Sequence, residues 1–174
     1  MTLAFVADRV LRWMMPEPNA YIAVFRPFVN LFGGKCFETG TADVIGDFAG
    51  VAQWLPPGVS MEDAPIVELF EQNLHEPVLG DLMNVFDQMT GYHPTGPHWY
   101  LALIGVDPAR QGQGLGSALL KHGLARCDQA QELAYLEATN QGCRELYLRM
   151  GFRQLGEIIS GDFPPLYPML REPR

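Results

Sequence analysis

Apolar residues along the first half of the chain recur mostly at helical spacing. This spacing predicts a helix over residues 2–15, a second over 20–32 and two more within 62–90, with a break near Pro77 or Gly80. Residues 35–39 and 48–54 are short strand-like segments, and the turn-rich stretch between them predicts a β-hairpin. The first half is therefore expected to be helical around one hairpin.

The second half alternates strand patterns with helix patterns. The apolar run "HWYLALIGV" is typical of a buried central strand, and Asp107-Pro108 ends it because proline cannot donate to a strand ladder. A helix over residues 114–130 follows, then a strand at "LAYLEAT" and a short helix at "CRELYLRM" that Gly151 closes as a left-handed cap. With final strands at "FRQLGEI" and "PLYPMLR", this order predicts an α/β sandwich.

Composition and charge narrow the class of protein. The 174 residues are 48% hydrophobic and 18% charged, which is typical of one folded domain. The net charge of -8 argues against nucleic-acid binding, and the cysteines and histidines lack the spacing of a metal site. No apolar run reaches membrane-spanning length and no signal peptide is evident, so we expect a cytoplasmic protein without a membrane partner.

Three alternating glycines, Gly112, Gly114 and Gly116, stand directly before the predicted helix at 114–130. The spacing excludes a P-loop, which needs a lysine before Ser117, and the GxGxxG dinucleotide fingerprint. It matches the pattern Q/R-x-x-G-x-G/A, in which main-chain amides at the positive end of a helix bind a pyrophosphate. The alternative is a tight strand-to-helix turn that binds nothing.

The strand, this loop and the later stretch "YLEATNQGCRELYLRMGF" together resemble the GNAT superfamily of acetyl-coenzyme A-dependent N-acetyltransferases. Within it, the likeness is greatest to puromycin N-acetyltransferase-like proteins. The resemblance over residues 97–155 implies an α/β GNAT-type fold: one domain over residues 1–174, its mixed central sheet splayed at the cofactor site and helices on both faces. Because the chain starts at what looks like the family's first helix, the usual first strand is expected to be absent.

The resemblance also implies how acetyl-coenzyme A is bound. The backbone of the central strand would pair with the pantetheine amides, and the glycine loop would hold the pyrophosphate. The implied cofactor-binding residues are Ile104, Gly105, Val106, Gln111, Gly112, Gln113, Gly114, Leu115, Gly116, Ser117, Asn140 and Tyr147.

Two residues are candidates for catalysis. Tyr147 matches the tyrosine that protonates the departing thiolate, although a tyrosine on a short amphipathic helix can also simply pack. Glu137 lies in an otherwise apolar strand, where a carboxylate is costly unless paired, and is either a general base or amine anchor or a member of a structural ion pair. His98 is a weaker candidate base. Cys143 stands where relatives often have a second asparagine and is not expected to be a nucleophile.

The resulting hypothesis is an enzyme that transfers acetyl from acetyl-coenzyme A to a primary amine of a small molecule, directly within a ternary complex. An alkyl amine titrates near pH 10, so such an enzyme needs a base for the amine and an acid for the thiolate. The rival hypothesis is a non-catalytic acyl-coenzyme A-binding module of the same fold. The sequence leaves the oligomeric state open, a homodimer included.

Overall fold

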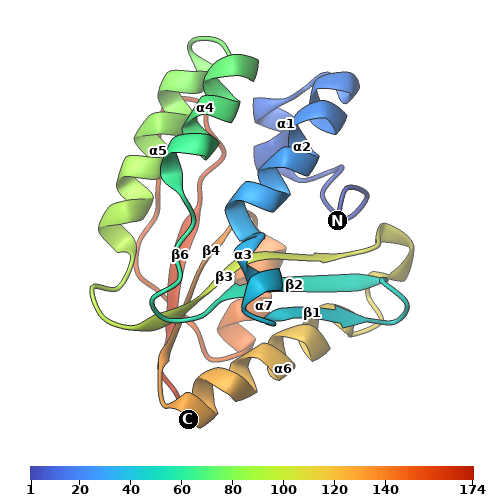
Figure 1. Cartoon of the computed structure of the whole chain (residues 1–174), viewed down its shortest axis with the longest axis vertical. Helices are drawn as coiled ribbons and strands as arrows, with labels where there is room; N and C mark the ends of the chain where they lie inside the picture. The colour runs from blue at the N-terminus through green and yellow to red at the C-terminus, as the bar shows by residue number, and fades with distance from the viewer.

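The computed structural model describes residues 1–174 as one mixed sheet with helices against both faces (Figure 1). The helices are α1 (Arg9–Met14), α2 (Pro18–Gly33), α3 (Lys35–Glu38), α4 (Asp63–Asn73), α5 (Val78–Tyr92), α6 (Leu115–Ala130), α7 (Gln141–Arg149) and a 3-10 turn (Pro108–Arg110). The strands are β1 (Ala42–Ile45), β2 (Gly50–Leu55), β3 (His98–Val106), β4 (Leu133–Ala138), β5 (Arg153–Gln154) and β6 (Tyr167–Arg171). No helix combines the length and apolarity needed to cross a bilayer.

The six strands lie in the order β1-β2-β3-β4-β6-β5. The β3–β4 pair is parallel, and the other neighbours are antiparallel. A parallel pair needs a crossover connection, and α6 supplies it here. The predicted α/β fold with a mixed sheet is therefore confirmed.

The two central strands separate partway along their length. β3 pairs with β4 only from His98 to Tyr100, yet β3 continues to Val106 with no strand on that side. The register against β2 shifts at the same level, because Gln53 faces Leu103 while Trp54 faces Leu101. A bulge bends the strand that carries it, and this one lies where β3 and β4 part. The resulting opening is called the split below.

Alternating side chains of the strands feed two separate apolar cores. On one face Tyr100 and Tyr135 pack with α1, α2, α4 and α5; on the other, Leu101 and Leu136 pack with α6 and α7. Figure 1 shows α6 beneath the sheet, α7 behind β1 and β2, and α1, α2, α4 and α5 above the sheet. The first face is called the upper face below.

The segment at residues 35–39 is not a strand. The chain does not leave the helical conformation after the helix predicted over 20–32, because Gly34 keeps right-handed angles (φ -65°, ψ -26°) and donates to the Asn30 carbonyl, so helical turns continue into α3. The fully buried Cys36 fixes that turn against the core. The hairpin itself is confirmed one segment later, as β1 and β2.

Two further boundaries differ from expectation. The first helix begins at Arg9 instead of residue 2, because the Asp8 carboxylate accepts the amides of Val10 and Leu11 and caps it there. The strand expected at "FRQLGEI" shrinks to Arg153–Gln154 plus an isolated bridge at Ile158. Gly151 has the expected left-handed conformation, with φ +95°.

Candidate functional site

The loop between β3 and α6 owes its shape to two of its glycines. Gly112 has φ +75° and Gly114 has φ +81°, a region that side chains with a Cβ rarely adopt, and no atom lies within 4 Å of where a Cβ would stand. Gly116 differs, because it lies inside α6 and a Cβ there would make ordinary contact with Val106. The conformation therefore requires glycine at 112 and 114, and the loop above them is open.

A row of main-chain amides in this loop has no protein acceptor. None of the amides of residues 112–117 donates to a backbone or side-chain atom, and the N-cap residue of α6, Gly114, offers no side-chain cap. These amides lie at the positive end of a sixteen-residue helix. Such a row fits the pyrophosphate of a coenzyme, which would supply the missing acceptors.

The unpaired side of β3 also presents main-chain groups. The Asp107 amide donates to the Ala49 carbonyl at 2.7 Å, which makes this a hydrogen-bonded pair of the antiparallel β2–β3 ladder. Hydrogen-bonded and non-hydrogen-bonded pairs alternate, so Val106 and Ile104 direct their N–H and C=O groups away from β2 and toward the split. Their orientation agrees with the predicted pairing to an extended ligand.

On the upper face, a cavity of about 100 Å³ reaches the split. Sixteen of its nineteen lining residues are hydrophobic, and the other three are Asp8, Glu137 and Thr139. β3 contributes Ala102 and Leu103 to this cavity, while Glu137 and Thr139 come from the end of β4 and the position just after it. The cavity therefore touches both strands where they separate, and its polar groups include two carboxylates.

Glu137 is buried with its two oxygens in different environments. The Tyr100 hydroxyl donates to Oε2 at 2.9 Å, whereas Oε1 has no hydrogen-bond partner. The nearest cation-forming atom is His93 Nε2, 3.4 Å from Oε1, and the Glu137 side chain is only 5% exposed. The ion-pair partner foreseen as one alternative thus exists, and a role as general base stays a prediction.

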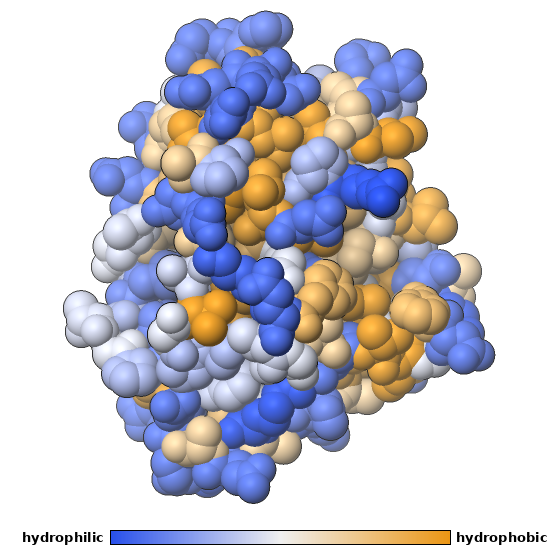
Figure 2. Space-filling model, viewed as in Figure 1, coloured by the Kyte–Doolittle hydropathy of each residue, from blue (hydrophilic) through white to orange (hydrophobic).

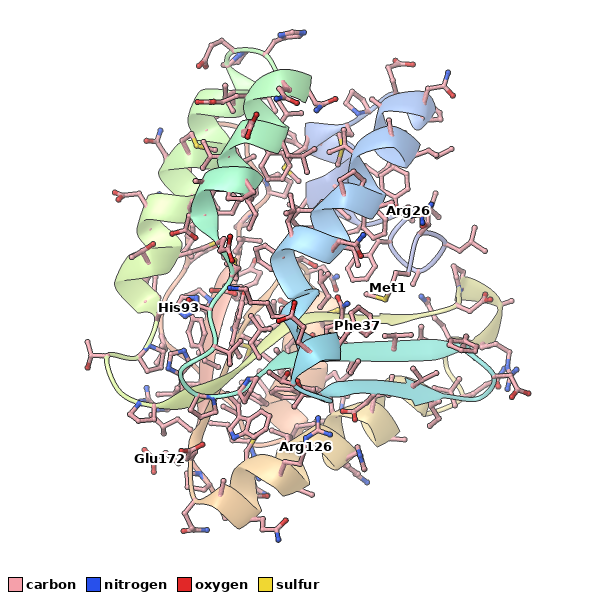
Figure 3. All side chains as sticks on the ribbon, viewed as in Figure 1. Met1, Arg26, Phe37, His93, Arg126 and Glu172 are labelled. Atoms are coloured by element: carbon pink, nitrogen blue, oxygen red, sulfur yellow. The ribbon has the colours of Figure 1, made fainter.

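The His93 imidazole also lies next to a second histidine, His98. His98 Nδ1 lies 2.8 Å from the Gly96 carbonyl, which only accepts, so this nitrogen carries a proton. Burial lowers the pKa of His98 and favours its neutral form, whose Nε2 then accepts from His93 Nδ1 at 3.4 Å. His93 thus has Nδ1 directed at His98 and Nε2 directed at Glu137 Oε1, 3.4 Å away. Figure 3 shows His93 below the end of α5, among the side chains at the edge of the sheet.

Tyr147 lies in the core on the lower face, beside Phe152. Burial, the neighbouring Cys143 thiol and the Asp8 carboxylate together raise the pKa of Tyr147 well above its ordinary value, so it is a neutral phenol near pH 7. Glu137 is on the upper face, because it alternates with Leu136 and Ala138 of the lower core. Tyr147 and Glu137 therefore belong to opposite faces of the sheet.

The remaining predicted cofactor residues have local roles. Asn140 caps α7 by accepting the Cys143 amide at 2.9 Å. Gln111 donates to the Val106 carbonyl at 3.2 Å, and Gln113 accepts from Arg110, so both glutamines brace the loop. Leu115 and Ser117 begin α6, and Gly105 lies on β3 under Ala4 and Phe5, where a Cβ would clash.

Sequence reasoning missed Asp8, Thr139 and His93. The Thr139 hydroxyl donates to Asp8 Oδ2 at 2.9 Å and links the start of α1 to the end of β4. The sequence held a signal for Asp8, an N-capping residue before a helical pattern, but apolar residues upstream disguised it. Nothing in the sequence indicated that His93 would meet Glu137.

A split parallel pair, with unpaired amides at a helix start beside it and a carboxylate cavity on one face, defines an acyltransferase-type site. Residues 78–152 match the model of the acetyltransferase (GNAT) family. A Corynebacterium glutamicum structure, described as histone acetyltransferase HPA2 and related acetyltransferase, is 31% identical with a TM-score of 0.68, covering 99% of this chain and 87% of that one. The chain belongs to the GNAT acetyltransferase family and is an acyltransferase enzyme.

Other relatives agree with this family at lower coverage or identity. An uncharacterized N-acetyltransferase of Schizosaccharomyces pombe is 28% identical over 95% of this chain and 69% of its own. Mycothiol acetyltransferase of Mycolicibacterium gilvum is 32% identical over 63% of this chain, which spans 39% of that relative. Arylalkylamine N-acetyltransferase 2 of Aedes aegypti, 12% identical with a TM-score of 0.63 over 99% of this chain and 91% of its own, shares the fold. The narrower likeness to puromycin N-acetyltransferases stays a prediction.

Proposed function

We propose that this protein transfers the acetyl group of acetyl-coenzyme A to a primary amine of a small molecule. The observation that carries the proposal is the split, because main-chain donors reach it from β3 and a buried carboxylate reaches it from β4. Family membership supports the use of acetyl-coenzyme A, and the amine acceptor is the part that we infer from the site.

The coenzyme would be held by main-chain groups. The amides of residues 112–117 would bind its pyrophosphate, and Ile104 and Val106 would pair with its pantetheine arm along the open side of β3. The bound coenzyme supplies an activated acetyl thioester. The amide of Val106 is free to donate to the oxygen that becomes negative when an amine attacks a thioester carbonyl.

The amine needs to lose a proton before it attacks, since a free alkyl ammonium group titrates near pH 10. In this proposal Glu137 Oε1 accepts that proton and passes it to His93 Nε2, 3.4 Å away. His93 is 28% exposed, so the proton reaches solvent from there. Tyr147, a neutral phenol, is the donor for the departing thiolate.

Steady-state kinetics with an acetyl-coenzyme A thiol-release assay test the proposal. With an amine that the wild type accepts, Glu137→Gln is expected to lower kcat/KM about a hundredfold, because the amide cannot take a proton. Glu71→Gln, an exposed glutamate on α4, is the matched control and should behave as wild type.

Two results would contradict this proposal. If no amine in a broad panel releases thiol above background, the acyl-coenzyme A-binding module becomes the better description. If Glu137→Gln keeps the wild-type rate, acetyl transfer stands but Glu137 is not the base.

A further inference from the structure

Most of the upper cavity is lined by apolar side chains, and its three polar residues lie at the start of α1 and around the end of β4. Six of its sixteen hydrophobic residues are phenylalanines, namely Phe5, Phe28, Phe32, Phe70, Phe86 and Phe163. Several of these rings are in contact, with centroids 5.7 Å apart for Phe28 and Phe70 and 6.0 Å apart for Phe70 and Phe86. Away from the split, the cavity therefore offers aromatic surface and no side chain that ionises.

At the split, two carboxylates line the same cavity, and the His93 imidazole lies behind that lining, 3.4 Å from Glu137 Oε1. Glu137 is 5% exposed and its Oε1 has no hydrogen-bond partner. Asp8 accepts two amides at Oδ1 and the Thr139 hydroxyl at Oδ2, which leaves about one of the four acceptor positions of a carboxylate free. Glu137 is buried and Asp8 is half-buried, and carboxylates in such an apolar setting favour a cation beside them.

We propose that the acceptor is an arylalkylamine, with its ammonium group between Asp8 and Glu137 and its ring among the phenylalanines. This inference rests on the proposed acetyl transfer and narrows its substrate to one chemical class. A ring in the cavity gains from burial and from edge or offset contacts with aromatic neighbours. A second charge or several hydroxyls at the far end would lose water and find no partner there.

Asp8 becomes a specificity-determining residue in this inference. It arrives from the start of α1, and its hydrogen bond to Thr139 holds its carboxylate at the end of β4. Its charge attracts the ammonium group, while its capping of α1 is a separate task that an asparagine performs equally well.

Initial rates with saturating acetyl-coenzyme A test the substrate class. The panel is 2-phenylethylamine, phenylalanine, 1,4-diaminobutane and glucosamine. Compared with 2-phenylethylamine, phenylalanine adds a carboxylate beside the amine. In 1,4-diaminobutane a second cation replaces the ring, and glucosamine carries several hydroxyls. The expected kcat/KM for 2-phenylethylamine exceeds that for each of the other three by about tenfold or more.

If 1,4-diaminobutane or glucosamine equals or surpasses 2-phenylethylamine, the arylalkylamine inference is wrong while acetyl transfer to amines stands. If none of these amines, nor any in the broader panel, releases thiol, acetyl transfer itself fails. The two failures are thus distinct.

Asp8→Asn tests the ammonium site separately, because it keeps the helix cap and removes the charge. The KM for 2-phenylethylamine should rise about tenfold while the KM for acetyl-coenzyme A stays within about twofold. Glu17→Gln is the matched control, since Glu17 is an exposed carboxylate at the start of α2 that makes no capping bond. An unchanged amine KM in folded Asp8→Asn would exclude Asp8 from the ammonium site.

Discussion

At the scale of single residues, the site depends on groups whose ionisation the fold controls. Burial is the largest cause of the raised pKa of Tyr147, and the Cys143 thiol and Asp8 carboxylate add to it. Burial is also the largest cause of the raised pKa of Cys143; the Asn140 side chain acts against it and Asp8 adds to it, so the thiolate is disfavoured. Both groups therefore keep their protons near pH 7, which suits Tyr147 as an acid and disfavours Cys143 as a nucleophile.

Tyr147→Phe removes that proton and almost nothing else. We expect kcat to fall about a hundredfold while the KM for acetyl-coenzyme A changes less than about twofold. Tyr167→Phe, on the half-buried tyrosine that stacks with Arg144, is the control. A loss smaller than about threefold would mean that Tyr147 only packs.

The raised pKa adds a test by pH. Since the phenol loses its proton only well above its ordinary pKa of 10, the wild-type kcat should show no decline from Tyr147 up to about pH 10. A decline centred near the ordinary tyrosine pKa that disappears in Tyr147→Phe would contradict the assigned environment.

At the scale of elements, the helices and strands that could be predicted are those whose local sequence pattern matches their environment in the fold. The continuous apolar run gave β3 its bounds of His98–Val106 directly, because this strand is buried on both faces. The glycine loop and α6 were predictable for a similar reason, because Gly112 and Gly114 adopt left-handed backbone conformations that favour glycine, and glycines are visible in the sequence.

Elements and contacts that depend on distant segments were less predictable. Lys35–Glu38 looked extended, yet it is helical because Gly34 continues the preceding turn and Cys36 has a buried position to fill. Likewise, His93 lies in a loop before β3 and Glu137 at the end of β4, so their contact depends on strand pairing that no local pattern encodes.

The β3–α6 loop can be tested as an element. In Gly114→Val, the new side chain has to adopt a left-handed backbone conformation and lies over the free amides. The variant should therefore bind acetyl-coenzyme A at least about tenfold more weakly, because strain and blocked contacts together cost about 1–3 kcal/mol. Gly40→Val is a close control, because Gly40 has φ +67° and equally open surroundings but lies between α3 and β1. Titration calorimetry on both variants decides; unchanged heats in folded Gly114→Val would exclude the loop as the pyrophosphate site.

At the scale of the whole molecule, two charged pairs join α6 to two strands far apart in the sheet, β1 and β6. Arg126 donates to both oxygens of Asp43 in β1, at 2.7 and 2.6 Å, and Figure 3 shows Arg126 on α6 beneath the hairpin. Arg171 of β6 likewise donates to both carboxylate oxygens of Asp128 in α6, at 2.7 and 2.9 Å. Both pairs lie in the second half of α6, so they fix the C-terminal part of this helix against the sheet. Figure 2 shows that apolar surface is exposed on the opposite, helical side, in the space between α4 and α2.

Asp128→Asn tests how much the second pair contributes to the fold. Arg171 is only 4% exposed, and its Nε also donates to the Met150 carbonyl, so removing its carboxylate leaves a buried cation. Because Asp128 itself is 27% exposed, we expect a loss of about 2 kcal/mol in the free energy of unfolding, below the cost of breaking a fully buried pair. Urea unfolding at pH 7 measures it, with Asp162→Asn, an exposed aspartate outside any ion pair, as control.

The pH dependence of that difference distinguishes the ion pair from a simple packing effect. The Arg171 guanidinium holds the pKa of Asp128 below its ordinary value of 3.8, so the folded state keeps this carboxylate ionised where the unfolded chain already takes up a proton. The stabilisation is therefore complete above the unfolded pKa and is lost as the pH falls through the lower folded pKa. The gap between wild type and Asp128→Asn should stay constant from about pH 6 to 8 and narrow below about pH 4. A gap that is the same at all these pH values would mean that Asp128 stabilises the end of α6 by its shape and not by its charge.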